Sequence, residues 1–278
     1  MRAIALHADV IVATSAVLQA NCVLVRGRAL QSAPQGVLGV IESSGGALSE
    51  TFVIDSPVLP EELASLPALV GQARYPEPSG LLATHGDWDH LLGRLAFPQL
   101  ALGCAQSTAE RLARSPGQAQ RELRAFDEDL LIERERPLTL GSVQALPVPG
   151  RCEVGAREIE LHRAEGHTDD GMAVMVGWAG VLVAGDYLSA VELPSLGDGG
   201  SIDAYLETLE RLRPLVGAAQ HIVPGHGPLL DGDLARRVLD EDTLYLSSLR
   251  EHGADAKLPD GRRSAAQRRV HAANAASV

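Results

Sequence analysis

The sequence predicts an α+β protein in which two β-sheets pack against each other between layers of helices. Runs rich in β-branched residues gather in two blocks, one in the first third of the chain and one from about residue 143 onward. Helical patterns follow each block, and no linker separates the two. The 278 residues, 45% of them hydrophobic, suffice to bury a sizeable core. We therefore expect a single domain over residues 1–278, with a C-terminal helical extension from about residue 231.

The first block is predicted to form strands joined by tight turns. Its β-rich runs are separated by glycines and cover Val10–Ala13, Asn21–Arg26, Val37–Glu42 and Thr51–Ile54. Pro60 and the two glutamates after it start a short helix, since proline and acidic side chains are favoured at a helix N-terminus. A further apolar strand, Leu81–Thr84, ends abruptly at His85. A helical pattern, broken near Pro116, covers residues 108–131.

The second block continues with strands and closes with helices. The predicted strands are Val143–Val148, Glu158–Arg163, Met172–Val176, Gly180–Ala184 and Gln220–Val223. Apolar residues at helical spacing predict one helix over residues 202–216 and a longer one over residues 234–249. The Arg- and Ala-rich tail from Pro259 onward is expected to form a loosely attached helix.

Composition excludes several classes of function. The 24 basic residues face 36 acidic ones, and the net charge of −12 repels a polyanion such as nucleic acid unless a local basic patch exists. Lys257 is the only lysine and lies in a polar stretch, which excludes a Walker-type phosphate loop and a Schiff-base enzyme. The chain contains no G-x-S-x-G segment, so the nucleophile of a serine hydrolase is not indicated.

Cysteine usage and hydropathy indicate a cytoplasmic protein. The three cysteines form no Cys-x-x-Cys pair and are too few for a disulfide scaffold, which suits a reducing compartment. The uncharged run Val10–Val25 is too short and too polar to span a bilayer, and Asp9 interrupts a signal-peptide core. We expect a small-molecule substrate and no nucleic-acid or membrane partner, while homo-oligomerisation stays open.

Potential metal ligands are concentrated at the ends of predicted strands. The segment Thr84-His85-Gly86-Asp87-Trp88-Asp89-His90 places four imidazole or carboxylate groups within six positions. Three further candidates, His167, Asp186 and His226, each follow a glycine. Glycine lets the chain turn sharply and approach an ion closely. Ligands delivered from several strand ends to one rim predict a metal cluster.

The ordered set H-x-D-x-D-H, G-H-T, G-D and P-G-H-G resembles the metallo-β-lactamase superfamily over about residues 21–228. The resemblance implies a four-layer αββα sandwich with one or two metal ions, zinc above all, at the shared edge of its two sheets. It assigns one ion to His85, Asp87 and His167 and the other to Asp89, His90 and His226, with Asp186 and a water or hydroxide bridging them. Asp55 matches a family aspartate that supports a metal-binding histidine from behind.

Asp87 departs from the family pattern, in which a histidine usually occupies this position. Two divalent ions carry +4, and Asp87, Asp89, Asp186 and one hydroxide cancel that charge, whereas a histidine in place of Asp87 would leave +1. A less positive cluster lowers the pKa of its bound water less strongly. Oxygen-favouring ions such as iron or manganese also become plausible beside zinc. Aspartate is short, however, and a side chain that failed to reach would leave an effectively mononuclear site.

The predicted reaction is metal-dependent hydrolysis by a metal-bound hydroxide, with Asp89 and Asp186 as the catalytic carboxylates. The substrate class covers esters, lactones, thioesters, amides and phosphoesters. Few basic side chains lie beside the motifs and an acidic stretch follows His226, so a neutral ester or lactone is favoured. The alternative is an iron-dependent oxidoreductase of the same fold, either a sulfur dioxygenase or a diiron type. Tyr187 either turns its hydroxyl toward a substrate oxyanion or packs beneath the loop.

Overall fold

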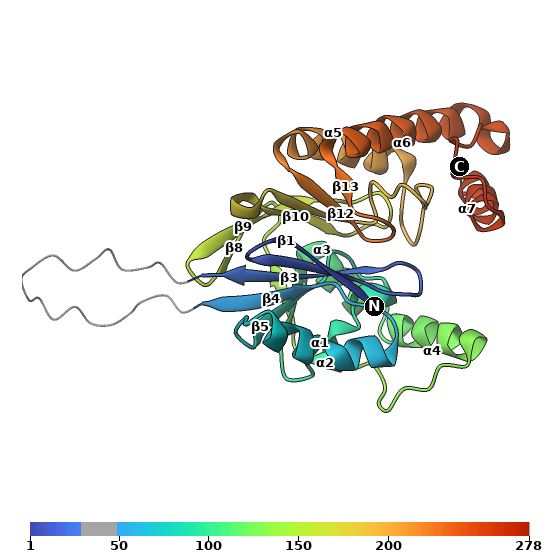
Figure 1. Ribbon diagram of the computed structural model, residues 1–278. Coiled ribbons are helices and arrows are strands. Elements are labelled where there is room, and N and C mark those ends of the chain that lie inside the picture. Colours follow the sequence, from blue (N-terminus) through green and yellow to red (C-terminus); the bar gives the residue numbers. More distant parts are fainter. Residues whose placement is uncertain (29–48, 278) are drawn as a thin grey trace, which may run out of the picture.

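A computed structural model describes residues 1–28 and 49–277 and has four layers. Two β-sheets lie at the centre, with α5 and α6 covering one outer face and α1, α2 and α4 the other (Figure 1). This arrangement confirms the predicted α+β class with two sheets between helical layers. The predicted strand at Val37–Glu42 lies outside the described residues.

The first sheet contains strands β1 to β7 in chain order. Strands β1 to β4 pair antiparallel, and β4 to β7 pair parallel. The carboxyl ends of β4 and β5 therefore lie at the same edge of this sheet. The strand bounds are Arg2–His7, Val10–Thr14, Asn21–Gly27, Glu50–Ile54, Pro78–Leu82, Leu102–Ala105 and Val143–Leu146.

The second sheet has the order β13-β12-β11-β10-β9-β8. Its strands pair antiparallel except β11 and β12, which run parallel, so that these two also end at one edge. The bounds from β8 to β13 are Gly150–Val154, Arg157–Arg163, Met172–Val176, Val181–Gly185, His221–Pro224 and Leu230–Asp231.

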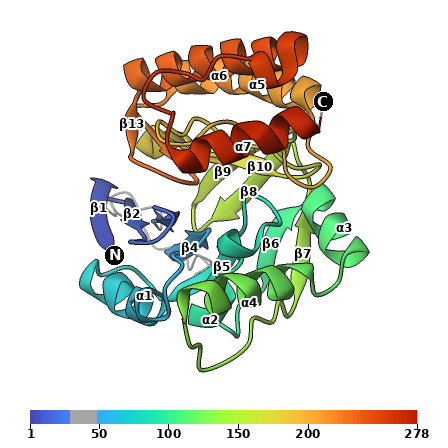
Figure 2. The same cartoon turned by 90° about the vertical axis from the view of Figure 1, so that its right-hand side faces the viewer.

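The helices lie outside the two sheets, and Figure 2 shows α5 and α6 above the sheets and α1, α2 and α4 below them from a second direction. The first half of the chain supplies α1 (Pro60–Gln72), α2 (Gly93–Ala96), α3 (Gln106–Arg114) and α4 (Gln118–Leu130). The second half supplies α5 (Ile202–Ala218), α6 (Gly232–His252) and α7 (Ala265–Ala276). Short 3-10 turns occur at Trp88–His90, Gly177–Ala179 and Gly253–Asp255. Among the described residues, no helix is both long and apolar enough to cross a lipid bilayer.

Three hydrophobic layers hold the sandwich together, because the central strands are apolar on both faces. In β2, Val10 and Val12 face the core between the sheets, while Ile11 contributes to the core beneath α1 and α4. In β11, Val183 joins the core between the sheets and Leu182 the core beneath α5 and α6. Side chains that alternate across a strand thus reach two cores at once, which explains why these strands read as continuous apolar runs.

The structure also differs from the sequence predictions at several elements. Strands β1, β6 and β8 were not predicted. β1 and β8 contain few large apolar side chains, with exposed residues among partly buried ones, and β6 is a short run. The tail is not loosely attached. Arg262 and Asn274 are buried, and α7 begins with a Ser264 side chain that accepts a hydrogen bond from the Gln267 N–H.

Candidate metal centre

The seven predicted ligands lie at one edge of the sandwich, where both sheets present the carboxyl ends of parallel strands. His85, Asp87, Asp89 and His90 follow β5, and Asp186 and His226 follow β11 and β12. His167 lies in the loop between β9 and β10. Residues up to 141 positions apart in the chain are thereby brought together, because the ends of adjacent parallel strands share one rim.

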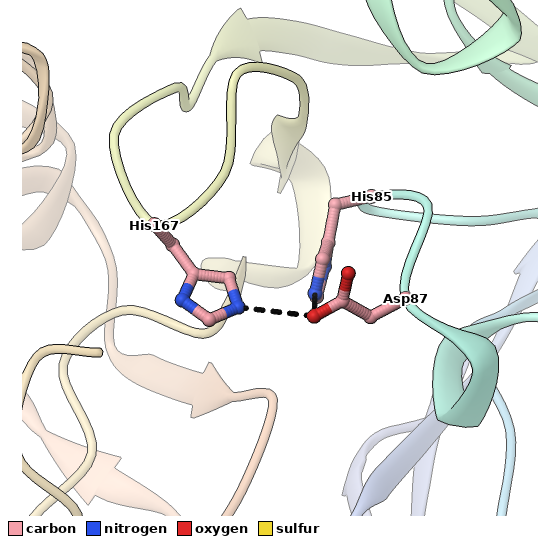
Figure 3. A group of neighbouring side chains, drawn as sticks. All are labelled: His85, Asp87 and His167. Atoms are coloured by element: carbon pink, nitrogen blue, oxygen red, sulfur yellow. Dashed lines mark hydrogen bonds and ion pairs between the residues drawn. The ribbon is translucent and has the colours of Figure 1, made fainter. Parts of the chain in front are cut away.

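One group of ligands consists of His85, Asp87 and His167. Figure 3 shows the Asp87 carboxylate between the two imidazoles, which arrive from opposite sides. Asp87 Oδ2 is 3.3 Å from His167 Nε2 and 3.6 Å from His85 Nε2. The short aspartate side chain therefore reaches both histidines.

A second group consists of Asp89, His90 and His226, and Asp186 lies between the two groups. His226 Nε2 is 3.2 Å from Asp89 Oδ2. Asp186 lies near all four histidines: its Oδ1 is 3.2 Å from His90 Nε2, and its Oδ2 is 3.4 Å from His226 Nε2 and 3.6 Å from the Nε2 atoms of His85 and His167. This is the position that a bridging carboxylate requires.

The spacing of these atoms fits a pair of divalent cations. Ligand atoms at tetrahedral zinc distances lie roughly 3.3–3.6 Å apart, and most of the separations above fall close to that range. Three buried atoms at the centre, His85 Nε2, His90 Nε2 and Asp186 Oδ1, have no hydrogen-bond partner among the described residues. Because a buried polar atom without a partner is costly, these atoms indicate that a cation satisfies them.

Each imidazole is oriented by a partner behind it. The Nδ1 atoms of His167 and His226 lie 2.8 Å from the carbonyl of Ser195 and 3.0 Å from that of Leu18. His85 Nδ1 is 3.2 Å from Thr84 Oγ1, and His90 Nδ1 is 3.1 Å from Asp55 Oδ2. These contacts leave every Nε2 facing the centre, as in metal sites whose histidines donate their other ring N–H away from the ion.

The charges of the site stabilise one another. Burial lowers the pKa of His167, but the Asp87 hydrogen bond and the Asp186 charge outweigh it and raise the pKa to about 9. Burial opposes ionisation of Asp186, yet the neighbouring charges of His226 and His90 hold the pKa of its carboxyl well below the usual range. These shifts arise because carboxylates pack against imidazoles. A divalent cation would bind the deprotonated imidazoles and replace their protons as the positive charge between the carboxylates.

Asp55 and Tyr187 both lie behind the ligands. Asp55 accepts hydrogen bonds from the Thr84 N–H at 2.8 Å and the Thr84 hydroxyl at 2.9 Å, and also contacts His90. Tyr187 is 3% exposed, and its hydroxyl accepts the His167 N–H at 3.0 Å. Of the two positions considered for Tyr187, the structure shows the packed one, with the hydroxyl supporting a ligand backbone.

Sequence reasoning missed Arg111 and the role of Asp170. Arg111 on α3 lies 2.8 Å from Asp87 and 2.9 Å from Asp170. Asp170 also accepts the Gly86 N–H at 2.9 Å. The sequence does not indicate the role of Arg111, because an arginine on an amphipathic helix is typical of a solvated face.

The loop after β11 is held by the C-terminal helix. Gln267 accepts a hydrogen bond from the Leu193 N–H at 2.7 Å, and Asn274 accepts one from the Leu196 N–H at 2.9 Å. Asn274 also donates to the Pro194 carbonyl at 2.7 Å. Because the Ser195 carbonyl in this loop contacts His167, α7 contributes indirectly to the orientation of a ligand.

Apolar side chains flank one side of the centre. Leu18, whose carbonyl contacts His226, is 40% exposed, and Val191 is 37% exposed. Val191 packs next to Gly227, where an added Cβ would lie 2.8 Å from its Cγ2 atom. Two exposed apolar residues thus contact His226 or its neighbour, Leu18 through its carbonyl and Val191 through its packing next to Gly227.

Comparisons with known proteins identify the fold of the chain. No curated protein matches the chain. A superfamily protein from the archaeon Sulfolobus tokodaii is 16% identical, with a TM-score of 0.61 over 97% of this chain and 98% of its own. A metallo-beta-lactamase family protein from Thermus thermophilus is 19% identical, with a TM-score of 0.62 over 90% of this chain and 83% of its own. TTHA1623, solved in a di-iron-bound form, is 20% identical, with a TM-score of 0.53 over 82% and 97%.

At these identities the solved structures establish the fold alone. The sequence signature that matches the chain covers residues 76–226, which is more than half of its length and includes all seven candidate ligands. The chain therefore belongs to the Metallo-beta-lactamase superfamily.

Proposed function

We propose that the protein is a metal-dependent hydrolase with a dinuclear centre. The observation that carries this proposal is the position of Asp186 within 3.2–3.6 Å of all four ligand histidines, between two triads of ligand atoms. Bound divalent cations would lower the pKa of a water to give a nucleophile near neutral pH and would stabilise the developing oxyanion. Asp89 and Asp186 would supply carboxylate ligands to those cations, Asp89 next to His226 and Asp186 between the two groups of ligands.

The surroundings of the centre favour an uncharged ester or lactone. Arg111, the cation in contact with a site carboxylate, is already paired with Asp87 and Asp170 and is 5% exposed, which leaves it poorly placed to bind a substrate phosphate. Val191, which is 37% exposed and packs next to Gly227, contributes an apolar side chain close to His226. An acyl or alkyl group without charge suits such a rim.

An iron-dependent oxidoreductase is the second candidate, and Asp87 favours it. A carboxylate in the ligand set adds an oxygen donor, which suits iron or manganese better than an additional imidazole does. The di-iron-bound form of TTHA1623 is a structural neighbour of similar fold. Iron-loaded protein that consumes oxygen in the presence of a thiol would support this second candidate.

Asp186→Ala tests the proposal directly. Protein loaded with zinc, manganese or iron is assayed on a panel of aryl esters and lactones. We expect turnover by the wild type and a loss of at least about a hundredfold in kcat/KM for the variant, because it removes the carboxylate shared by both cations. Asp169→Ala, which removes a half-exposed carboxylate paired with Arg114, is the matched control and should keep full activity. Full activity of Asp186→Ala would refute the assignment.

A further inference from the structure

A buried arginine joins the two loops that carry the ligands of one cation. Arg111 Nη2 is 2.8 Å from Asp87 Oδ1, and its Nη1 is 2.9 Å from Asp170 Oδ1. Asp87 belongs to the loop after β5 in the first sheet, whereas Asp170 follows β9 in the second. One guanidinium therefore bridges ligand loops from both sheets next to His85 and His167.

Both carboxylate oxygens of Asp170, at one end of this bridge, accept hydrogen bonds. The Asp170 side chain is 0% exposed, its Oδ2 accepts the Gly86 N–H at 2.9 Å, and its Oδ1 also accepts the Thr168 hydroxyl at 2.8 Å. A Cβ at position 86 would lie 3.3 Å from Asp170 Oδ2 and 3.4 Å from Arg111 Nη1. Glycine at this position thus leaves the space that the bridge needs, and Asp170 fixes the guanidinium in place.

The two oxygens of Asp87 consequently have different partners. Oδ1 lies against Arg111, and Oδ2 faces the imidazoles of His85 and His167. A free carboxylate rotates and can bind a cation through either oxygen or through both. The planar fork of an arginine held at its other end restricts that rotation, because two of its N–H directions are fixed at once.

We propose that Arg111 is a positioning residue of the metal centre: by holding Oδ1 it commits Asp87 to bind a cation through Oδ2 alone, and it thereby sets the affinity of the site formed by His85, Asp87 and His167. The inference rests on the proposed function only in that this site takes a divalent cation. This role explains how the short aspartate can replace the histidine that is usual at this position. An imidazole presents one nitrogen in a fixed direction, and Arg111 fixes the direction of one Asp87 oxygen in a comparable way.

The test measures zinc affinity by competition with a chromophoric chelator, together with the visible spectrum of the cobalt-substituted protein. We expect two tightly bound cations in the wild type. Arg111→Met should weaken one of them by about 10- to 100-fold, which is typical for loss of a partner behind a ligand, and leave the other unchanged. Arg111→Lys should shift affinity in the same direction, because an ammonium cannot hold two carboxylates in one plane, and it serves if the methionine variant does not fold. Arg114→Met, on the same helix and 56% exposed at the side chain, is the control and should bind like the wild type.

A double-mutant cycle separates positioning from a purely structural role. In an Asp87→Ala background, Arg111→Met should cause no further loss of zinc affinity, because no carboxylate is left to orient. An equal loss in both backgrounds, wild-type affinity of Arg111→Met, or fewer than two bound cations in the wild type would each overturn the inference. Two-cation binding without turnover of any substrate would contradict the proposed function and leave this inference standing.

Discussion

A buried ion pair between Arg262 and Asp242 helps to attach the C-terminal segment, and its removal gives a large predicted effect. The side chains of Arg262 and Asp242 are 2% and 1% exposed. Arg262 also donates to the carbonyls of Ser189 and Glu192, in the loop that leads from β11 toward the metal centre. Arg262→Met leaves the Asp242 carboxylate buried without its partner, and we expect a loss of about 3–5 kcal/mol in the free energy of unfolding.

Urea unfolding followed by circular dichroism measures this loss, and limited proteolysis tests whether the tail detaches first. Arg263→Met is the matched control, because Arg263 pairs with Asp260 at the surface, with side chains 55% and 92% exposed. The control should stay within about 0.5 kcal/mol of the wild type. An Arg262→Met protein with wild-type stability and a wild-type proteolysis pattern would refute the reasoning and restore the expectation of a loosely attached tail.

The same variant has a predicted pH dependence. Burial raises the pKa of Asp242 from 3.8 to about 7, while the charge and hydrogen bond of Arg262 oppose that rise. Without Arg262 the folded-state pKa is higher still. A carboxyl whose pKa is higher in the folded than in the unfolded state takes up its proton preferentially when folded, so the variant gains stability as the pH falls through that folded-state pKa. The difference between variant and wild type should therefore be larger at about pH 8 than at about pH 5.

Three further predictions concern the supports of the centre. Glu62→Gln should lower the free energy of unfolding by about 1.5–3 kcal/mol, because the buried carboxylate accepts the Ser15 hydroxyl at 2.6 Å and the Ala16 N–H at 2.9 Å, both in the turn between β2 and β3. Burial acts to raise the pKa of Glu62, but these bonds outweigh it and lower the pKa below 4.5. The difference in the free energy of unfolding between wild type and variant, measured with urea, should therefore shrink as the pH falls through that lowered pKa. Asp87→His should raise the proportion of zinc over iron and manganese in protein grown with mixed metals, and identical metal contents would count against an effect of the carboxylate. Asn274→Ala frees the Leu196 N–H and the Pro194 carbonyl, and steady-state kinetics should show a roughly five- to thirtyfold fall in kcat/KM with the metal content unchanged.

The ligand cluster could be predicted because its residues carry a local signal. His85, Asp186 and His226 each end or closely follow an apolar strand, and two of them follow a glycine that allows the sharp turn. Strands such as β2 and β11 could be predicted for a related reason, since burial on both faces leaves uninterrupted apolar runs. The same short segments therefore contain both the candidate ligands and the residue patterns that predict the local fold.

The supports of that cluster could not be predicted, because each depends on a contact between distant segments. Arg111 on α3 and Asn274 on α7 look like ordinary polar positions of amphipathic helices, yet both are buried against carboxylates or backbone groups near the centre. Strand β1 has only two large apolar side chains, Ile4 and Leu6, and both are only partly buried, so its pattern is weak. No pattern within either helix says which residue it will meet, so these roles require the assembled sandwich.

The orientation of His226 depends on a distant contact that the sequence does not predict, and this contact is made by backbone atoms. Its Nδ1 contacts the carbonyl of Leu18, and the Gly227 N–H donates to the carbonyl of Gln19. Leu18 and Gln19 have φ angles of 58° and 51°, a left-handed conformation that costs non-glycine residues of order 1 kcal/mol or more each. Glu62 holds this turn from its other side through the Ala16 N–H. The strain is thus located where a carbonyl must point at a ligand, and the cost is offset by bonds from α1, which ties the orientation of His226 to a helix more than 150 residues away in the chain.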